Sequence, residues 1–156
     1  MGSFDIDRIK PELGPLTSAL LEYWEQARGE RVMPARADID PIDIPRLLPF
    51  ILLLEVDNDT GRVKIRLMGT RVRDLYGEEY TGRHLDEIFF GRNREQVLTS
   101  YNEALDSRAP HHCWMRFTNK DGLEFDMERL ILPLSGDGTK IDMFISLLDI
   151  HPGVPR

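Results

Sequence analysis

The stretch at residues 62–89 limits the possible folds of this chain more than any other segment. It opens with an alternation in which Val63, Ile65 and Leu67 fall on one side, which is the period of a half-buried β-strand. The rest of the stretch is divided into short helical pieces by Gly69, Gly77 and Gly82. Because each piece is too short to be stable alone, the pattern is unsuited to a helix bundle and favours a cover over one face of a sheet.

The remaining elements supply that sheet. Residues 50–56 are almost continuously apolar, which predicts a strand buried on both faces. The turn signal that follows predicts an antiparallel hairpin, and helical spacing predicts helices over 15–29 and 92–107. The five predicted strands lie at 50–56, 62–68, 111–119, 123–134 and 140–150. We therefore expect an α+β fold, a five-stranded antiparallel sheet with short helices on one face and an N-terminal helix.

Composition narrows the possible partners. Twenty Lys and Arg against 27 Asp and Glu give a formal net charge of −7, which opposes non-specific binding to nucleic acid.

No apolar run approaches the roughly 20 residues that cross a membrane, so we expect no membrane contact. A single cysteine, Cys113, excludes an intramolecular disulfide and a multi-cysteine zinc cage. A reducing cytoplasm is the expected location.

An ordered set of short motifs resembles a known family. The motifs are Leu-Glu-Tyr-Trp at 21–24, Pro-Arg-Leu-Leu-Pro at 45–49, Ile-Arg-Leu-Met-Gly-Thr at 65–70, Tyr-Thr-Gly-Arg-His-Leu at 80–85, and Leu-Pro-Leu at 132–134 followed by Gly-Asp-Gly at 136–138. Over residues 16–150 they resemble the PAS domain, and most closely a single-domain bacterial PAS subfamily of alphaproteobacterial type. The resemblance implies a sensor or adaptor, with no general ligand for the subfamily.

The resemblance and the order of elements together divide the chain. We expect a flexible lead-in at 1–14, an N-terminal helix at 15–29, a connector at 30–49, a PAS core at 50–150 and a tail at 151–156. Since these residues include no kinase, cyclase or DNA-binding segment, a signal is expected to leave by protein contact.

One tetrapeptide resembles part of a flavin-binding motif. Gly-Arg-Asn-Arg at 91–94 is similar to the start of the flavin-binding motif in blue-light PAS sensors, where a cysteine follows the asparagine and attacks the excited flavin. Arg94 stands in the place of that cysteine, so adduct photochemistry is excluded. The same residues are also an ordinary start of a helix. We predict no cofactor.

A candidate ligand cavity lies between the sheet and the short helices, where a PAS ligand would bind. Arg129 shares the alternation of Met127 along its strand and can meet an anionic group. Methionines and aromatic residues at alternating positions also make a plain core, so a cavity and a close-packed core both remain open. The residues that can converge there are Tyr76, Cys113, Met115, Phe117, Phe125, Met127 and Arg129.

Metal or haem ligation is the main alternative. His111 and Cys113 lie two apart on one strand, and they are the nearest pair of ligand types. The helix at 92–107, which carries the ligand in haem-binding PAS domains, contains no histidine, and His84 and His151 are too remote in sequence to be placed. We predict no metal site. The alternative function is a haem- or small-molecule-carrying protein, or a degenerate enzyme, that uses Cys113 and the histidines.

Enzymatic motifs are not apparent. There is no serine nucleophile elbow, Walker loop or HExxH sequence, and no catalytic residue is predicted. The carboxylates of Glu124, Asp126 and Glu128 alternate on one strand face, which we expect to be solvated. The leading hypothesis is a cytoplasmic PAS-type sensory or adaptor module that is not an enzyme. It would act through a signalling protein, and a small ligand in an apolar cavity could gate it.

Two apolar patterns predict a homodimer. The first helix carries a stripe, and the last strand presents a second apolar set that we place away from the main core. One short helix covers a five-stranded sheet incompletely. We therefore favour two protomers that pair their helices over a single helix folded back on its own sheet. The predicted dimer or partner face is Leu16, Leu20, Leu21, Trp24, Trp114, Phe144, Leu148 and Ile150.

Overall fold

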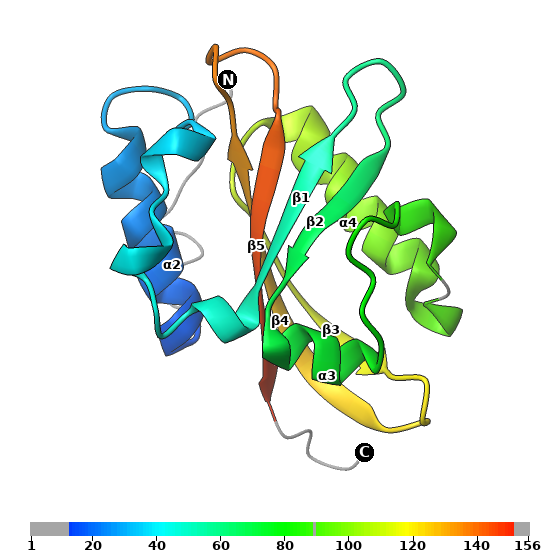
Figure 1. The fold of residues 1–156 in the computed structure, drawn as a ribbon. Coiled ribbons are helices and arrows are strands. Elements are labelled where there is room, and N and C mark those ends of the chain that lie inside the picture. The colour runs from blue at the N-terminus through cyan, green and yellow to red at the C-terminus, as the bar shows by residue number, and fades with distance from the viewer. Residues whose placement is uncertain (1–12, 89, 152–156) are drawn as a thin grey trace.

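A computed structural model describes residues 13–88 and 90–151 and contains a five-stranded antiparallel sheet of order β2-β1-β5-β4-β3 (Figure 1). The strands are β1 (Ile51–Val56), β2 (Val63–Met68), β3 (His111–Thr118), β4 (Glu124–Leu134) and β5 (Met143–His151). The predicted α+β fold is confirmed. Most of the predicted lead-in at 1–14 and tail at 151–156 lies outside the described residues.

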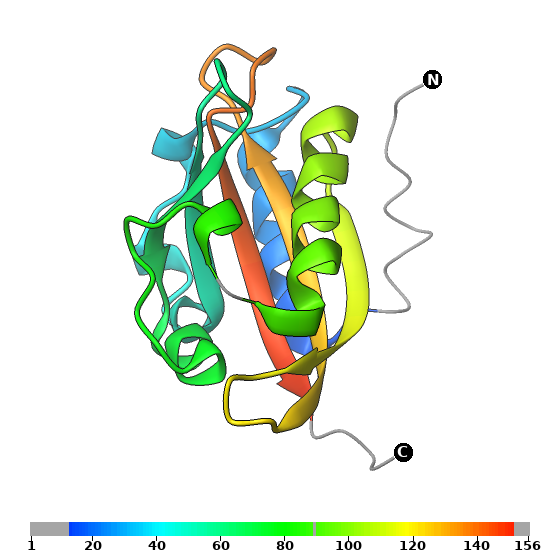
Figure 2. The same ribbon diagram turned by 90° about the vertical axis from the view of Figure 1, so that its right-hand side faces the viewer.

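The helical segments that follow β2 and precede β3 in the sequence cover one face of the sheet. They are α3 (Thr70–Tyr76), η5 (Leu85–Glu87), η6 (Gly91–Asn93) and α4 (Arg94–Ser107). Figure 2 looks onto this face and shows α4 lying along the strands. The short helix α3 ends at Gly77, whose left-handed backbone conformation is one that glycine adopts without strain.

The opposite face is covered by α2 (Pro15–Arg28) and by the connector that follows it. The connector contains three single turns: η2 (Arg36–Asp38), η3 (Pro41–Asp43) and η4 (Leu48–Phe50). The indole of Trp24 donates a hydrogen bond to the Pro133 carbonyl at 2.9 Å, which fixes α2 to β4. No helix in the described part of the chain is long and apolar enough to span a membrane.

The two faces of β5 are the reverse of those expected. The Phe144 ring lies 5.7 Å from that of Tyr101 in α4, and the Ser146 hydroxyl shares a 2.9 Å hydrogen bond with the Tyr101 hydroxyl. Phe144, Leu148 and Ile150 therefore belong to the side covered by α4. Alternation separates the side chains of a strand into two sets, but it does not say which cover each set meets.

The apolar stripe of α2 packs against the sheet of its own chain. This is the alternative to the helix-paired dimer that the sequence favoured. Leu20, Leu21 and Trp24 are at most 2% exposed within a single chain, and Phe144 and Leu148 are equally buried. Leu16 and Ile150 are partly buried. The dimer was favoured because one short helix covers the sheet incompletely. The single turns of the connector extend that cover beyond α2. Of the eight residues placed on a dimer face, Trp114 is the most exposed, at 43%.

Candidate functional site

The site lies on the α4 side of the sheet, where β3 and β4 present their alternate residues. The antiparallel register places Cys113 opposite Arg129, Met115 opposite Met127, and Phe117 opposite Phe125. These pairs form the floor of the site, and α3, η6 and α4 form its cover.

Close backbone packing positions α3. Gly69 precedes the helix, and a Cβ atom there would clash with the backbone carbonyls of Leu48 and Pro49. Its amide donates a 2.7 Å hydrogen bond to the Ile51 carbonyl. Any larger residue would push the start of α3 away from η4, so the glycine couples the cover of one face to the connector on the other.

Tyr76, the last residue of α3, lies at the centre of an aromatic cluster. Its ring centroid is 5.4 Å from that of Phe117, 5.5 Å from that of Phe90 and 6.3 Å from that of Tyr80. The residue is 5% exposed. Its hydroxyl accepts a hydrogen bond from Nη2 of Arg129 at 3.2 Å.

Arg129 is fully buried. Its guanidinium carbon lies 5.5 Å from the centroid of the Tyr101 ring. Nε and Nη1 have no hydrogen-bond partner among the described residues, and no described carboxylate forms an ion pair with the group. A buried charge without a counter-charge is costly, and arginine does not escape the cost by losing its proton.

The neighbouring tyrosines do not neutralise this charge. Burial raises the pKa of Tyr101 to about 12, although the charge of Arg129 opposes the shift. Burial also raises the pKa of Tyr76, again against the effect of Arg129. Both phenols are therefore protonated at neutral pH, and the guanidinium is left with neutral neighbours.

A pocket of about 190 Å³ lies next to this cluster. Tyr76 connects the two, because it is one of the residues that line the pocket and its hydroxyl accepts a hydrogen bond from Arg129. Two cationic side chains belong to the lining, Arg92, which lies 3.9 Å from a carboxylate oxygen of Glu124, and Lys120. The positive charge of Lys120 favours an anionic occupant. The lining residues are Tyr76, Tyr80, Phe90, Gly91, Arg92, Phe117, Thr118, Asn119 and Lys120.

The structure unites part of the predicted cavity set. Tyr76 and Phe117 line the pocket, and Arg129 is connected to it by the hydrogen bond to the Tyr76 hydroxyl. Met115 and Met127 are buried in the core, Phe125 is partly buried, and the Cys113 sulfur lies 3.9 Å from the Ser100 hydroxyl. Sequence reasoning missed the loop residues of the lining, because loops carry no periodicity that would indicate which way a side chain points.

The histidines do not gather around Cys113. His111 shares its face and lies 2.7 Å from a carboxylate oxygen of Glu103, whereas His112 lies 2.8 Å from one of Glu128. His84 pairs with β2 in an isolated bridge. Glu128 was expected on a solvated face. That expectation is wrong, since its side chain is fully buried beneath the start of α2.

The described residues thus form an α+β domain in which short helices cover a five-stranded antiparallel sheet and a small pocket. A family model described as "PAS domain" matches residues 14–148, and the chain belongs to that family. No curated protein matches it.

Solved structures share the fold at low identity. The LOV domain of a blue-light-activated histidine kinase from Erythrobacter litoralis has a TM-score of 0.54 and 14% identity, over 68% of this chain and 99% of that one. A PAS domain from Colwellia psychrerythraea has a TM-score of 0.52 and 14% identity, over 70% and 95%. The Rhodobacter sphaeroides LOV protein has a TM-score of 0.51 and 16% identity, over 72% and 68%.

Proposed function

We propose that this chain is a cytoplasmic sensory or adaptor module, rather than an enzyme, that binds a small anionic ligand at Arg129. One observation carries the proposal: a fully buried guanidinium has two nitrogens without a partner among the described residues. An apolar residue of similar size would spare the fold this charge, so the arginine calls for another explanation. A carboxylate or phosphate would supply the missing acceptors, because arginine binds both through charge-assisted hydrogen bonds.

Tyr76 is proposed as the gate between pocket and charge. A ligand in the pocket would contact Tyr76, which is one of the lining residues. Displacement of the ring takes its hydroxyl from Arg129 and opens the guanidinium to the anion. Because Tyr76 ends the seven-residue helix α3, this movement would shift the helix as a whole.

The other end of α3 adjoins a second surface, which we name the connector groove. It has a volume of about 430 Å³ and is mostly apolar. Leu67 in the groove is 45% exposed. The residues that line the groove are Arg36, Ile39, Pro41, Ile44, Pro45, Leu48, Pro49, Ile51, Leu53, Leu67, Met68, Gly69, Thr70 and Ile145.

We propose the connector groove as the output surface. Gly69 and Thr70, at the start of α3, belong to its lining, so a shift of α3 changes its shape. An exposed apolar groove is a favourable place for protein contact. The homodimer predicted from the first helix would use this groove rather than the α2 stripe, and a signalling protein would compete for it. Replacement of Leu67 with Lys should weaken either contact, as light scattering and pull-down experiments would report.

Thermal unfolding with a panel of acetate, succinate and inorganic phosphate tests the ligand. At least one anion should raise the melting temperature of the wild type and leave that of Arg129→Met unchanged. Arg66→Met is the matched control, because it removes an exposed guanidinium whose Nε lies 3.4 Å from Glu55. The proposal fails if no anion of the panel produces a shift that depends on Arg129.

A further inference from the structure

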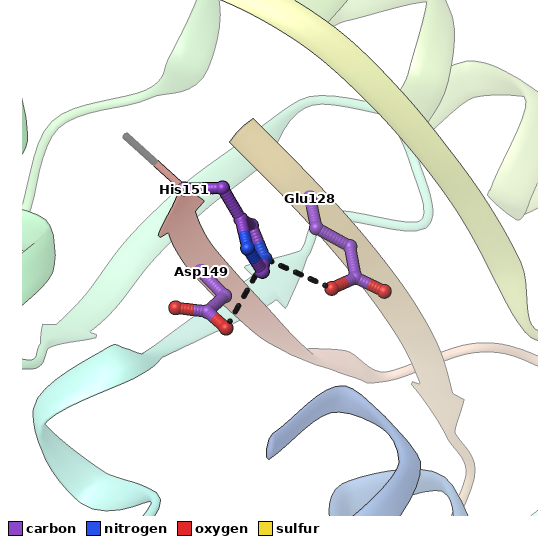
Figure 3. A group of neighbouring side chains, drawn as sticks. All are labelled: Glu128, Asp149 and His151. Carbon is purple, nitrogen blue, oxygen red and sulfur yellow. Dashed lines mark ion pairs between the residues drawn. The ribbon is translucent and has the colours of Figure 1, made fainter. Parts of the chain in front are cut away.

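A second polar cluster lies on the α2 side of the sheet, away from the ligand pocket. It consists of Glu128 on β4 with Asp149 and His151 on β5 (Figure 3). His151 Nε2 is 3.5 Å from an oxygen of Glu128 and 3.4 Å from an oxygen of Asp149. The three potential ligand atoms all lie within 4.8 Å of one another.

The register of the sheet brings the cluster together. Glu128 pairs directly with Asp149 across β4 and β5, and His151 is two residues further along the same face. Two carboxylates directly opposite each other repel unless a positive charge lies between them. A cation at this place would remove that repulsion.

The Nε2 atom of His151 faces both carboxylates at ion-pair distance, although the side chain as a whole is 35% exposed. Its Nε2 is buried and makes no hydrogen bond to any described residue. Separations of 3.4 and 3.5 Å are longer than usual N–H···O hydrogen bonds. They match the spacing of two ligands that share one metal ion, since tetrahedral ligands at about 2.1 Å from zinc are about 3.4 Å apart.

Neighbouring groups hold Glu128 in a fixed orientation. His112 Nε2 lies 2.8 Å from Oε2, and the Gly14 amide donates to both carboxylate oxygens at 3.0 and 3.2 Å. A Cβ atom at position 14 would lie 2.7 Å from Oε1 of Glu128, so glycine leaves space beside that oxygen. Hydrogen bonds of this kind orient metal-binding side chains and tune their affinity.

We propose that Glu128, Asp149 and His151 bind a divalent transition-metal cation, with His112 orienting Glu128. Zn²⁺ fits best, because one imidazole and two carboxylates are ligands that it accepts in four-coordinate sites, with water in the fourth position. Mg²⁺ and Ca²⁺ fit poorly, because they prefer more oxygen ligands. The sequence-based expectation of no metal rested on His111 and Cys113, which lie on the other face.

The position of the site gives the metal a structural consequence. Gly14 immediately precedes α2, and its amide is bonded to the Glu128 side chain. A bound cation would therefore join β4 and β5 to the start of the N-terminal helix. Metal occupancy and the attachment of α2 should change together.

Calorimetric titration of the chelator-treated full-length chain with ZnCl₂ tests the proposal. We expect one Zn²⁺ per chain and a rise in melting temperature, with no comparable effect of MgCl₂. His151→Gln and Asp149→Asn should weaken Zn²⁺ binding by more than the roughly 10- to 100-fold that outer residues control, and His112→Gln should fall within that range. His111→Gln is the matched control, because it removes a close histidine–glutamate pair outside the cluster, the 2.7 Å pair with Glu103.

A spectroscopic measurement separates the site from adventitious binding. The Trp114 ring lies 4.8 Å from that of His151, so Co²⁺ in the site should quench its fluorescence. Trp114→Phe should abolish this quenching and retain stoichiometric Zn²⁺ binding. Absence of stoichiometric binding in the wild type, or binding that survives both His151→Gln and Asp149→Asn, would overturn the proposal. His151 would then be only an ion-pair partner of two carboxylates.

Discussion

Nη2 of Arg129 donates a 3.2 Å hydrogen bond to the Tyr76 hydroxyl, and this contact joins β4 to the end of α3. Both residues are buried, and the Tyr101 ring, 5.5 Å from the guanidinium carbon, is uncharged at neutral pH. The contact is therefore the place at which a competing anion would gain most and would move α3. The ligand proposal and the signalling proposal both depend on it.

Replacement of Arg129 with methionine tests whether the arginine serves the fold or a ligand. In buffer without binding anions, we expect Arg129→Met to leave the free energy of unfolding unchanged or to raise it by about 1–4 kcal/mol, because an unpaired buried charge is removed. Urea denaturation measures the change. A loss of more than about 3 kcal/mol would mean that the guanidinium is satisfied within the fold and is structural.

Tyr76→Phe removes the hydroxyl and keeps the ring. We expect a loss of about 1–3 kcal/mol in the free energy of unfolding, since Nη2 of Arg129 is left without its acceptor. Affinity for the anion should rise, because the hydroxyl no longer competes for the guanidinium. Weaker binding in this variant, measured by calorimetry, would show that the hydroxyl belongs to the binding site rather than to the gate.

Tyrosine titration reports the burial of Tyr101. Its pKa is raised from 10.0 to about 12 by desolvation, so the folded state holds the phenolic proton more tightly than the unfolded state. The stabilisation is complete below pH 10 and is lost as pH rises towards 12. We expect the free energy of unfolding of Tyr101→Phe to depend less steeply on pH in this window. Ionisation of Tyr101 near pH 10 in the folded protein, seen by ultraviolet absorbance, would contradict the burial.

Leu21→Ala tests the position of α2. Because Leu21 is fully buried in a single chain, its truncation should cost about 2–5 kcal/mol and leave the oligomeric state unchanged. Glu22→Ala, on the exposed side of the same helix, is the control and should be nearly neutral. A small loss of stability with conversion of a dimer to monomers in light scattering would place α2 between two chains instead.

The sequence was sufficient for the fold because its signals were local. Alternation at Val63 and Ile65 indicated a half-buried strand, and turn residues between the last three strands indicated an antiparallel sheet. The faces of β5 were not predictable in this way. Which cover meets Phe144 depends on where α2 and α4 pack, and that is settled by contacts between distant segments.

The same reason explains the uneven prediction of the sites. Arg129 and Tyr76 were identified because an arginine on an apolar strand face and an aromatic residue in a glycine-broken cover are visible in sequence. The cluster of Glu128 and His151 was not identified, since it requires the register of two strands and burial by the start of α2. No local pattern records either requirement.

The proton on Nε of Arg129 gives the most direct test of the anion site. In a ¹H–¹⁵N spectrum of the arginine side chains, we expect a resonance protected from solvent that is missing in Arg129→Met. It should shift on addition of the anion that raises the melting temperature, while the resonance of the exposed control Arg66 stays in place. An Arg129 resonance that does not move when that anion saturates the protein would contradict the account.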